Sequence, residues 1–132
     1  MPPTDVNAVT EKIIGCAYRV SNSLGIGFVE KVYENALAHD IQNTGLKVIQ
    51  QAPIKVLYDG IVVGDFFADL LVEEQVLVEL KAVSMLNDEH VAQSLNYLRA
   101  TGLEICLLIN FGTPKVQLKR LRRSMNWNPP TF

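Results

Sequence analysis

The feature that most constrains this chain is the stretch of residues 65–83, in which isolated charged residues interrupt two apolar runs. A polar segment, residues 73–75 (EEQ), separates the runs and predicts a turn, so the stretch predicts a β-hairpin buried on at least one face. Three ionisable side chains, Asp69, Glu79 and Lys81, then project from buried strands. These residues are the first candidates for a functional site.

The length of the turn decides which of these side chains meet, because successive strand residues point to opposite faces. Glu79 and Lys81 project together, while Leu80 faces the core. With a three-residue turn, Asp69 lies directly opposite Glu79, with Cβ atoms roughly 4.5–5.5 Å apart. A turn of two or four residues places them on opposite faces. Two adjacent buried carboxylates repel, so we expect a hard divalent cation, Mg²⁺ or Mn²⁺, between them.

The length and composition predict a single domain over residues 1–132, with residues 124–132 as a loosely held tail. The chain has 132 residues, of which 48% are hydrophobic, enough for a sizeable core. Its apolar runs are shorter than the ~20 residues that span a bilayer. The first residues lack the basic and then apolar pattern of a secretion signal. We therefore expect a cytoplasmic protein that does not enter a membrane.

Charge is unevenly distributed along the chain. Residues 1–110 carry seven Lys and Arg against fourteen Asp and Glu, whereas residues 111–132 carry five basic residues and no acidic residue. A basic segment attached to an acidic body is able to hold phosphates. Lys and Arg are also common on the edge strands of sheets. The sequence leaves both interpretations open.

Hydrophobic periodicity predicts eight elements in the order α-α-β-β-β-α-β-β. This order belongs to the α/β (α+β) class, with a mixed central sheet flanked by helices. The helices are expected over residues 5–24, 28–43 and 89–100, and the strands over 54–58, 61–72, 76–83, 104–111 and 116–121.

The spacing of the charged residues resembles a known nuclease motif. Asp69, nine intervening residues and then the sequence ELK at 79–81 resemble the motif of the PD-(D/E)XK nuclease superfamily, whose fold is restriction-endonuclease-like. That fold contains the order α-β-β-β-α-β, which is present here. The residue before Asp69 is Ala68, whereas the motif has proline, a variation that this divergent superfamily tolerates.

Two further segments strengthen the resemblance. Residues 27–33 (GFVEKVY) match the signature of the GxxExxY family, a family of small bacterial and archaeal proteins assigned to this superfamily. Residues 93–97 (QSLNY) match the QxxxY pattern that RecB-type nucleases carry on the helix after the core strands. The ordered matches extend over about residues 5–110, so the chain resembles the GxxExxY family over most of its length.

The resemblance implies a nuclease that uses Mg²⁺ or Mn²⁺ to hydrolyse phosphodiester bonds of DNA or RNA, with DNA the favoured partner. It implies that Asp69, Glu79 and the backbone carbonyl of Leu80 hold the metal. Lys81 is then the residue that orients water and offsets phosphate charge. Glu30 is the additional helical carboxylate, with a catalytic and metal-binding role. Two of these residues also have a purely structural interpretation. Glu30 is favourable at a helix N-terminus, and Lys81 could form a structural ion pair.

Three more residues are implied as support for the site or substrate: Tyr33, Gln93 and Tyr97. Tyr33 and Tyr97 have a structural alternative, since an aromatic residue at such a position is also typical of packing between a helix and a sheet. The whole chain has alternatives too. One is a catalytically silent module on the same fold that binds nucleic acid or supports assembly. Another is a homodimer joined through its sheet edge or first helices.

Overall fold

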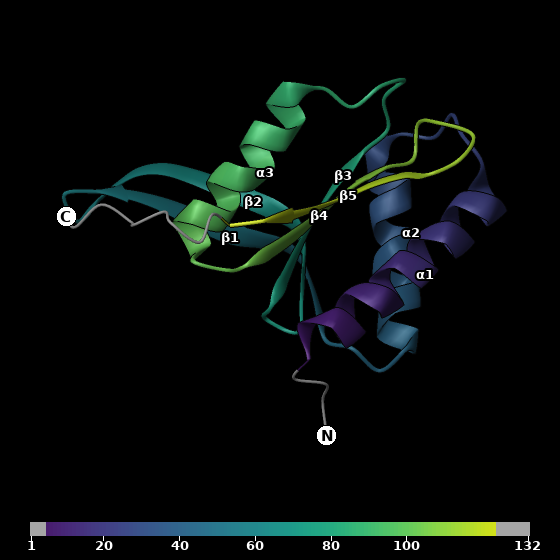
Figure 1. Ribbon diagram of the computed structural model, residues 1–132, viewed down its shortest axis with the longest axis horizontal. Coiled ribbons are helices and arrows are strands. Elements are labelled where there is room, and N and C mark those ends of the chain that lie inside the picture. Colours follow the sequence, from purple (N-terminus) through teal and green to yellow (C-terminus); the bar gives the residue numbers. More distant parts are fainter. Residues whose placement is uncertain (1–4, 124–132) are drawn as a thin grey trace.

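The computed structural model describes residues 5–123 and confirms the predicted order of elements (Figure 1). The expected tail at residues 124–132 lies outside the described residues. The helices are α1 (Val6–Leu24), α2 (Glu30–Asn43) and α3 (Asp88–Thr101). The strands are β1 (Val48–Tyr58), β2 (Ile61–Val72), β3 (Val76–Lys81), β4 (Ile105–Asn110) and β5 (Gln117–Arg122).

The largest difference from the sequence prediction is in β1, which begins at Val48 rather than near residue 54. The polar pair Gln50 and Gln51, followed by Pro53, hides the alternation of the first half of this strand. Proline is tolerated there because β1 lies at the edge of the sheet.

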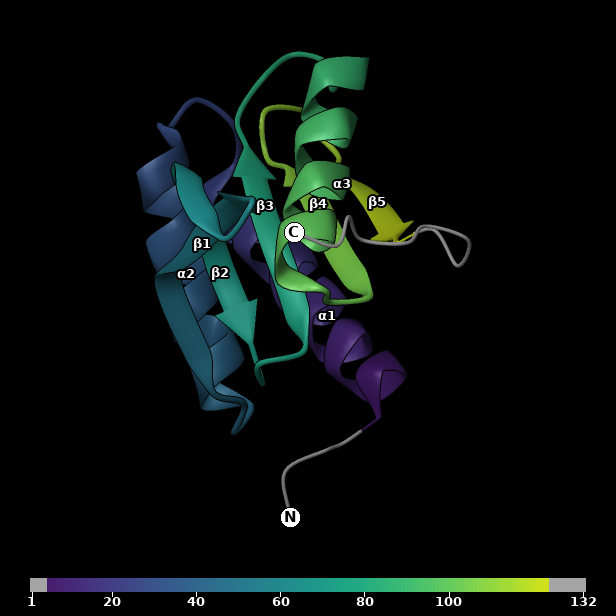
Figure 2. The same cartoon turned by 90° about the vertical axis from the view of Figure 1, so that its left-hand side faces the viewer.

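The five strands form one mixed sheet in the order β1-β2-β3-β4-β5. Only β3 and β4 are parallel to each other; the other neighbouring pairs are antiparallel. Helix α3 makes the crossover between the two parallel strands, as a parallel pair requires. Figure 2 shows α3 on one face of the sheet and α1 and α2 on the other.

Each face of the sheet has its own core. On one face, α1 and α2 contribute residues such as Ile13 and Leu37, which pack against strand residues such as Leu80. On the other, α3 packs Leu98 against Leu77. All six residues of β4 are buried, because helices cover this strand on both faces. This burial explains the near-continuous apolar run in its sequence.

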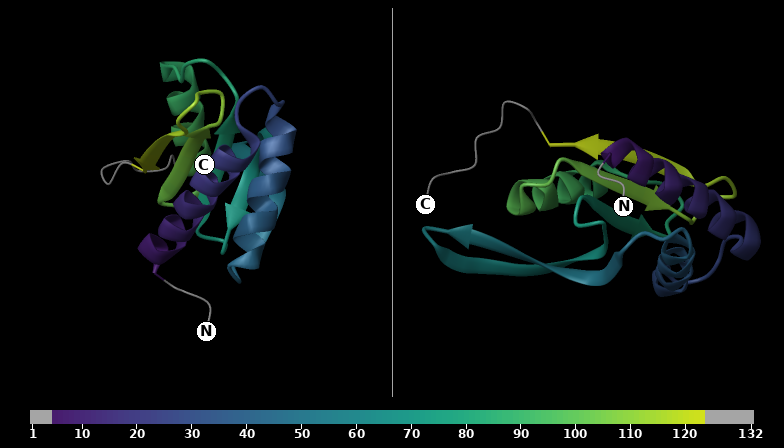
Figure 3. Two further views of the ribbon diagram at one scale, coloured as in Figure 1. Left: turned by 90° about the vertical axis from the view of Figure 1, so that its right-hand side faces the viewer. Right: turned by 90° about the horizontal axis from the view of Figure 1, so that it is seen from below.

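The β1–β2 hairpin is the longest part of the sheet. Its strands have 11 and 12 residues, whereas β3 has 6. Figure 3 shows the hairpin projecting past α3. The helices therefore leave its far end, around residues 57–67, largely uncovered.

The basic C-terminal segment forms an edge strand. Lys119, Arg120 and Arg122 are exposed on β5, which pairs only with β4 on its inner side. Arg120 donates a hydrogen bond to the Asn7 side chain at 2.6 Å. This placement agrees with the edge-strand interpretation, while binding of phosphates by this segment stays a prediction. Within residues 5–123, no helix has the length and apolar character needed to cross a membrane.

Candidate active site

The turn between β2 and β3 has the length that the site requires. Residues 73–75 connect strands in which Val72 pairs with Val76 and Leu70 with Val78. Glu73 and Glu74 adopt left-handed backbone conformations, with φ of 53° and 57°. The three-residue turn therefore confirms the predicted register, and Asp69 and Glu79 are the next residues along the two strands.

At Asp69 and Glu79 the two strands separate, and side chains replace the backbone ladder. The Asp69 N–H donates to Glu79 Oε2 at 2.8 Å. In return, the Leu80 N–H donates to Asp69 Oδ2 at 2.7 Å. Each carboxylate thus satisfies a backbone donor of the opposite strand. These reciprocal hydrogen bonds bring the two predicted acidic residues together.

Both carboxyl groups are held where ionisation is unfavourable. Glu79 is 5% exposed, and burial together with the charge of Asp69 raises its pKa from 4.5 to about 8. Burial also raises the pKa of Asp69, although the hydrogen bond from Leu80 opposes this shift. A cation beside the pair would favour the ionised form of both groups.

Lys81 and Glu30 lie around this pair at different depths. Lys81, the last residue of β3, is half-buried, and its charge acts to lower the pKa of both Asp69 and Glu79. Glu30, the first residue of α2, is exposed, and its charge contributes to the raised pKa of Glu79. Glu30 does not close a cluster with the other two, since residues 5–123 contain no group of three or more His, Cys, Asp or Glu able to hold a metal ion.

Tyr33 lies in the core. It is fully buried, and its ring stacks on Phe111 with centroids 4.8 Å apart. Its hydroxyl donates to the Gly25 carbonyl at 2.5 Å and accepts from the Phe28 N–H at 3.3 Å. The packing alternative is therefore the one observed. A direct contact with substrate is wrong for this side chain, which instead holds the loop that leads into Glu30.

Gln93 and Tyr97 form a pair on α3. Gln93 Nε2 donates to the Tyr97 hydroxyl at 3.0 Å. Tyr97 is mostly buried and lies 5.8 Å from Phe66 between ring centroids. Burial raises the pKa of Tyr97, and the charge of Glu79 adds to the shift. The pair thus lies close enough to Glu79 for the Glu79 charge to shift the pKa of Tyr97.

Sequence reasoning missed two polar residues beside the site, Glu34 and Gln51. Glu34 is 4% exposed, and its charge contributes to the raised pKa of Asp69. Gln51 donates to both carboxylates, at 2.8 Å to Glu34 Oε1 and 3.4 Å to Asp69 Oδ1. The available signal was the position of Glu34, one turn after Glu30 on the same helix.

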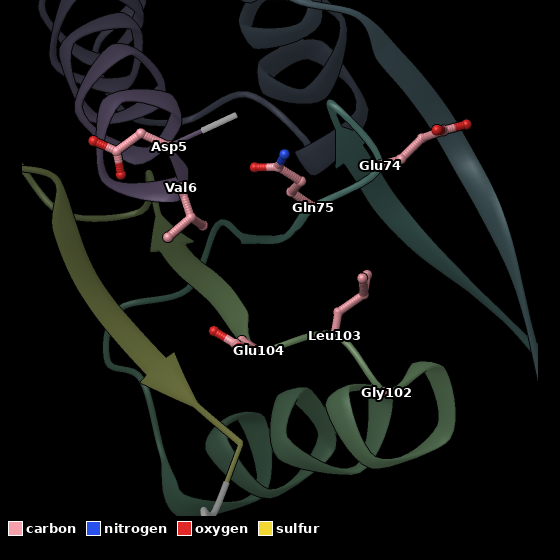
Figure 4. Close-up of a pocket in the computed structure, with 7 residues that line it drawn as sticks. All are labelled: Asp5, Val6, Glu74, Gln75, Gly102, Leu103 and Glu104. Carbon is pink, nitrogen blue, oxygen red and sulfur yellow. The ribbon is translucent and has the colours of Figure 1, made fainter. Parts of the chain in front are cut away.

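A surface hollow at the other end of β3 is separate from these residues. Figure 4 shows it between the β2–β3 turn, the start of α1 and the loop after α3. It contains none of the candidate residues. The hollow is lined by Asp5, Val6, Glu74, Gln75, Gly102, Leu103 and Glu104.

Comparison with known families agrees with the geometry. The family model described as "PD-(D/E)XK nuclease superfamily" matches residues 7–121. The chain belongs to this superfamily. This PD-(D/E)XK protein has no match among curated proteins.

Two solved structures share the fold of this PD-(D/E)XK protein. One is an alkaline exonuclease, LHK-Exo, from Laribacter hongkongensis, with a TM-score of 0.55 and 19% identity over 92% of this chain and 72% of that chain. The other is LHK-Exo in complex with dAMP, with a TM-score of 0.56 and 19% identity over 89% and 69%. At this identity the likeness shows the fold, and it confirms the predicted restriction-endonuclease-like class.

Proposed function

We propose that this protein is a divalent-metal-dependent nuclease that hydrolyses phosphodiester bonds of DNA. The observation that carries the proposal is the meeting of Asp69 and Glu79 where β2 and β3 separate. Within the superfamily, the motif at residues 27–33 favours the GxxExxY family. A cytoplasmic location stays a prediction from the sequence.

The donor set fits Mg²⁺ or Mn²⁺. Mg²⁺ is commonly held by one or two carboxylates together with waters and substrate phosphates, so a third protein carboxylate is not required. Asp69 and Glu79 supply the two carboxylates. The N–H and C=O of a strand residue point to the same edge, so the Leu80 carbonyl faces the gap that its N–H faces. This oxygen is the third protein ligand that we propose.

The remaining residues have roles that follow from their charge and position. A divalent ion supplies Lewis-acid stabilisation and a water of lowered pKa. Lys81 shares the face of Glu79, orients the attacking water and offsets charge on the phosphate. Glu30 approaches from α2 as an additional carboxylate at the rim. Gln93 is the residue of the α3 pair that we expect to contact the nucleic-acid backbone, with Tyr97 holding its amide.

DNA is proposed over RNA because one of the similar structures is a complex of LHK-Exo with dAMP, a deoxynucleotide. The test uses single-stranded, duplex and branched DNA and the matching RNAs, with Mg²⁺ or Mn²⁺. We expect cleavage of DNA by the wild type and none by Glu79→Ala. Asp65→Asn is the matched control, since Asp65 lies on the same strand as Asp69 but is exposed and pairs with Lys55. Equal activity of Glu79→Ala, or no cleavage with either metal, would contradict the proposal.

A second candidate function, an assembly module that forms a homodimer, is favoured by the exposed far end of the β1–β2 hairpin. This apolar tip consists of Leu57, Tyr58, Ile61, Val62, Val63, Phe66 and Phe67, each at least 43% exposed. Lys55, two residues before Leu57 on β1, pairs with Asp65 at 3.2 Å, and the apolar side chains of the tip favour an apolar partner. Because β1 is also a sheet edge, a second copy of this chain is the occupant that we propose.

Light scattering at micromolar concentration tests this assembly. We expect a dimer for the wild type and a monomer for Phe67→Glu, which places a charge in the apolar tip. Val29→Glu is the matched control, because Val29 is 71% exposed but lies before α2, away from the hairpin. A monomeric wild type would contradict the dimer without affecting the nuclease proposal.

A further inference from the structure

The pairing of β1 with β2 is interrupted opposite Asp69. Gln50 pairs with Leu70 and Ala52 with Ala68, but Gln51 and Asp69, which lie between these pairs, do not pair. Gln51 instead has φ of 54°, in the left-handed region that residues other than glycine, asparagine and aspartate seldom adopt. The backbone of β1 is therefore held in an unusual conformation at the position nearest the site.

The side chain of Gln51 uses this position to bridge two carboxylates. Its Nε2 atom donates to Glu34 Oε1 at 2.8 Å and to Asp69 Oδ1 at 3.4 Å. An amide nitrogen carries two hydrogens, so one is available for each carboxylate. The other oxygen of Asp69 accepts from the Leu80 N–H at 2.7 Å. Donors on both oxygens fix the rotation of the Asp69 carboxylate.

Glu34 is a suitable anchor for this bridge because it is buried and is itself held. Its second oxygen, Oε2, accepts from Lys31 Nζ at 2.9 Å and from Gln50 Nε2 at 2.8 Å. The Lys31 ammonium offsets its charge across one turn of α2. Glu34 thus connects α2 to β1 and determines where the Gln51 amide can lie.

We infer that Gln51 and Glu34 are positioning residues that hold the Asp69 carboxylate in the orientation in which it binds the divalent cation. This inference rests on the proposed function. Partners that orient a metal ligand typically contribute 10–100-fold to metal affinity. Without the bridge, the Asp69 carboxylate is free to rotate away from the gap between β2 and β3, and its hydrogen bond with Leu80 weakens.

The variant Gln51→Gly tests the inference, because glycine accepts the left-handed backbone and removes only the side chain. Mn²⁺ binding is measured by electron paramagnetic resonance, together with the Mn²⁺ dependence of DNA cleavage. We expect about 10-fold weaker Mn²⁺ binding, a matching rise in the Mn²⁺ needed for cleavage and an unchanged KM for DNA. Asp65→Asn is the control, since Asp65 is exposed on β2 and pairs with Lys55, and it should bind Mn²⁺ as the wild type does.

Hydrogen exchange of the Leu80 amide provides a readout without metal. We expect faster exchange in Gln51→Gly than in the wild type or Asp65→Asn, because the Asp69 carboxylate that holds this amide is no longer fixed. If the wild type neither binds Mn²⁺ nor cleaves DNA, the proposed function fails, and Leu80 exchange alone decides whether the bridge positions Asp69. Wild-type Mn²⁺ affinity and wild-type Leu80 exchange in Gln51→Gly would overturn the inference.

Discussion

Glu79 is a carboxyl group in a position that opposes its own ionisation. Its pKa of about 8 results mainly from burial and secondly from the charge of Asp69. Between about pH 4.5 and 8, the folded protein therefore retains a proton that the unfolded chain releases. The contribution of this proton to stability is fully present below pH 4.5 and is lost as the pH rises through 8. Above about pH 8, where Glu79 is ionised and able to bind a cation, the buried carboxylate therefore lowers the stability of the metal-free protein.

Replacing Glu79 with glutamine should remove this pH dependence of stability. Glutamine does not ionise, so we expect metal-free Glu79→Gln to be more stable than the wild type near pH 9, by on the order of 2 kcal/mol. Near pH 4.5 the two proteins should be equally stable. Urea unfolding at both pH values measures the difference, with Asp65→Asn as the control. A stability difference that does not change with pH would contradict the prediction. Glu79→Gln should also lose DNA cleavage at every pH.

Lys81 is expected to act on the reaction rather than on metal binding. We predict that Lys81→Met lowers the rate of DNA cleavage about 100-fold, because the positive charge beside the phosphate is lost. Mn²⁺ affinity should change only a few-fold, since Lys81 is a cation and not a ligand. Calorimetry and single-turnover cleavage separate the two effects. If Lys81 is only a structural ion pair, cleavage persists and the melting temperature falls.

Among the elements, the end of β3 is held in place by the last residue of β4 and the loop that follows it. Asn110 is fully buried, and its side chain accepts from the Val83 and Gly112 N–H groups and donates to the Val83 carbonyl and Gln117. The Lys81 carbonyl accepts from the Phe111 N–H at 2.8 Å. These hydrogen bonds fix the point at which the chain leaves the site.

The two glycines Gly112 and Gly15 give opposite predictions for the same substitution. A Cβ at Gly112 would meet the backbone of Val83, so we expect Gly112→Ala to destabilise the fold by about 3 kcal/mol. A Cβ at Gly15, exposed in the middle of α1, would meet no atom within 4 Å. We therefore expect Gly15→Ala to stabilise by about 0.5–1 kcal/mol. Urea unfolding of the pair measures both, and similar losses in the two variants would contradict this account of the β4–β5 loop.

For the whole molecule, the sheet connects the site to overall stability. Asp69 and Glu79 lie on neighbouring central strands, so the unfolded chain separates them, and an ion that binds both favours the folded state. Because Glu79 must lose a proton to bind the ion, affinity should rise as the pH approaches 8.

We predict that Mn²⁺ at 100 times its Kd stabilises the wild type by about 2.7 kcal/mol. Differential scanning calorimetry at pH 8 should show a higher melting temperature with Mn²⁺ than without it, and a smaller increase at pH 6. Glu79→Ala should show no increase at either pH. An equal increase in Glu79→Ala would place the ion elsewhere on the protein.

The amino-acid sequence by itself predicted the presence and order of the elements. Strand and helix periods predicted all eight elements, and the turn at residues 73–75 predicted that Asp69 and Glu79 meet, because alternation and loop length set the register. The first half of β1 was missed because its polar residues, including Gln50 and Gln51, conceal the alternation.

Tertiary structure decided what depends on contacts between distant segments. The Tyr33 hydroxyl is buried against Gly25, and Gln51 bridges Glu34 to Asp69. Periodicity does not predict either contact, because each joins residues of different segments. The exposure of the hairpin tip was likewise decided by where α3 ends on the sheet. A sequence pattern shows which face of an element is apolar, whereas only packing shows which other element covers that face and which polar groups meet beneath it.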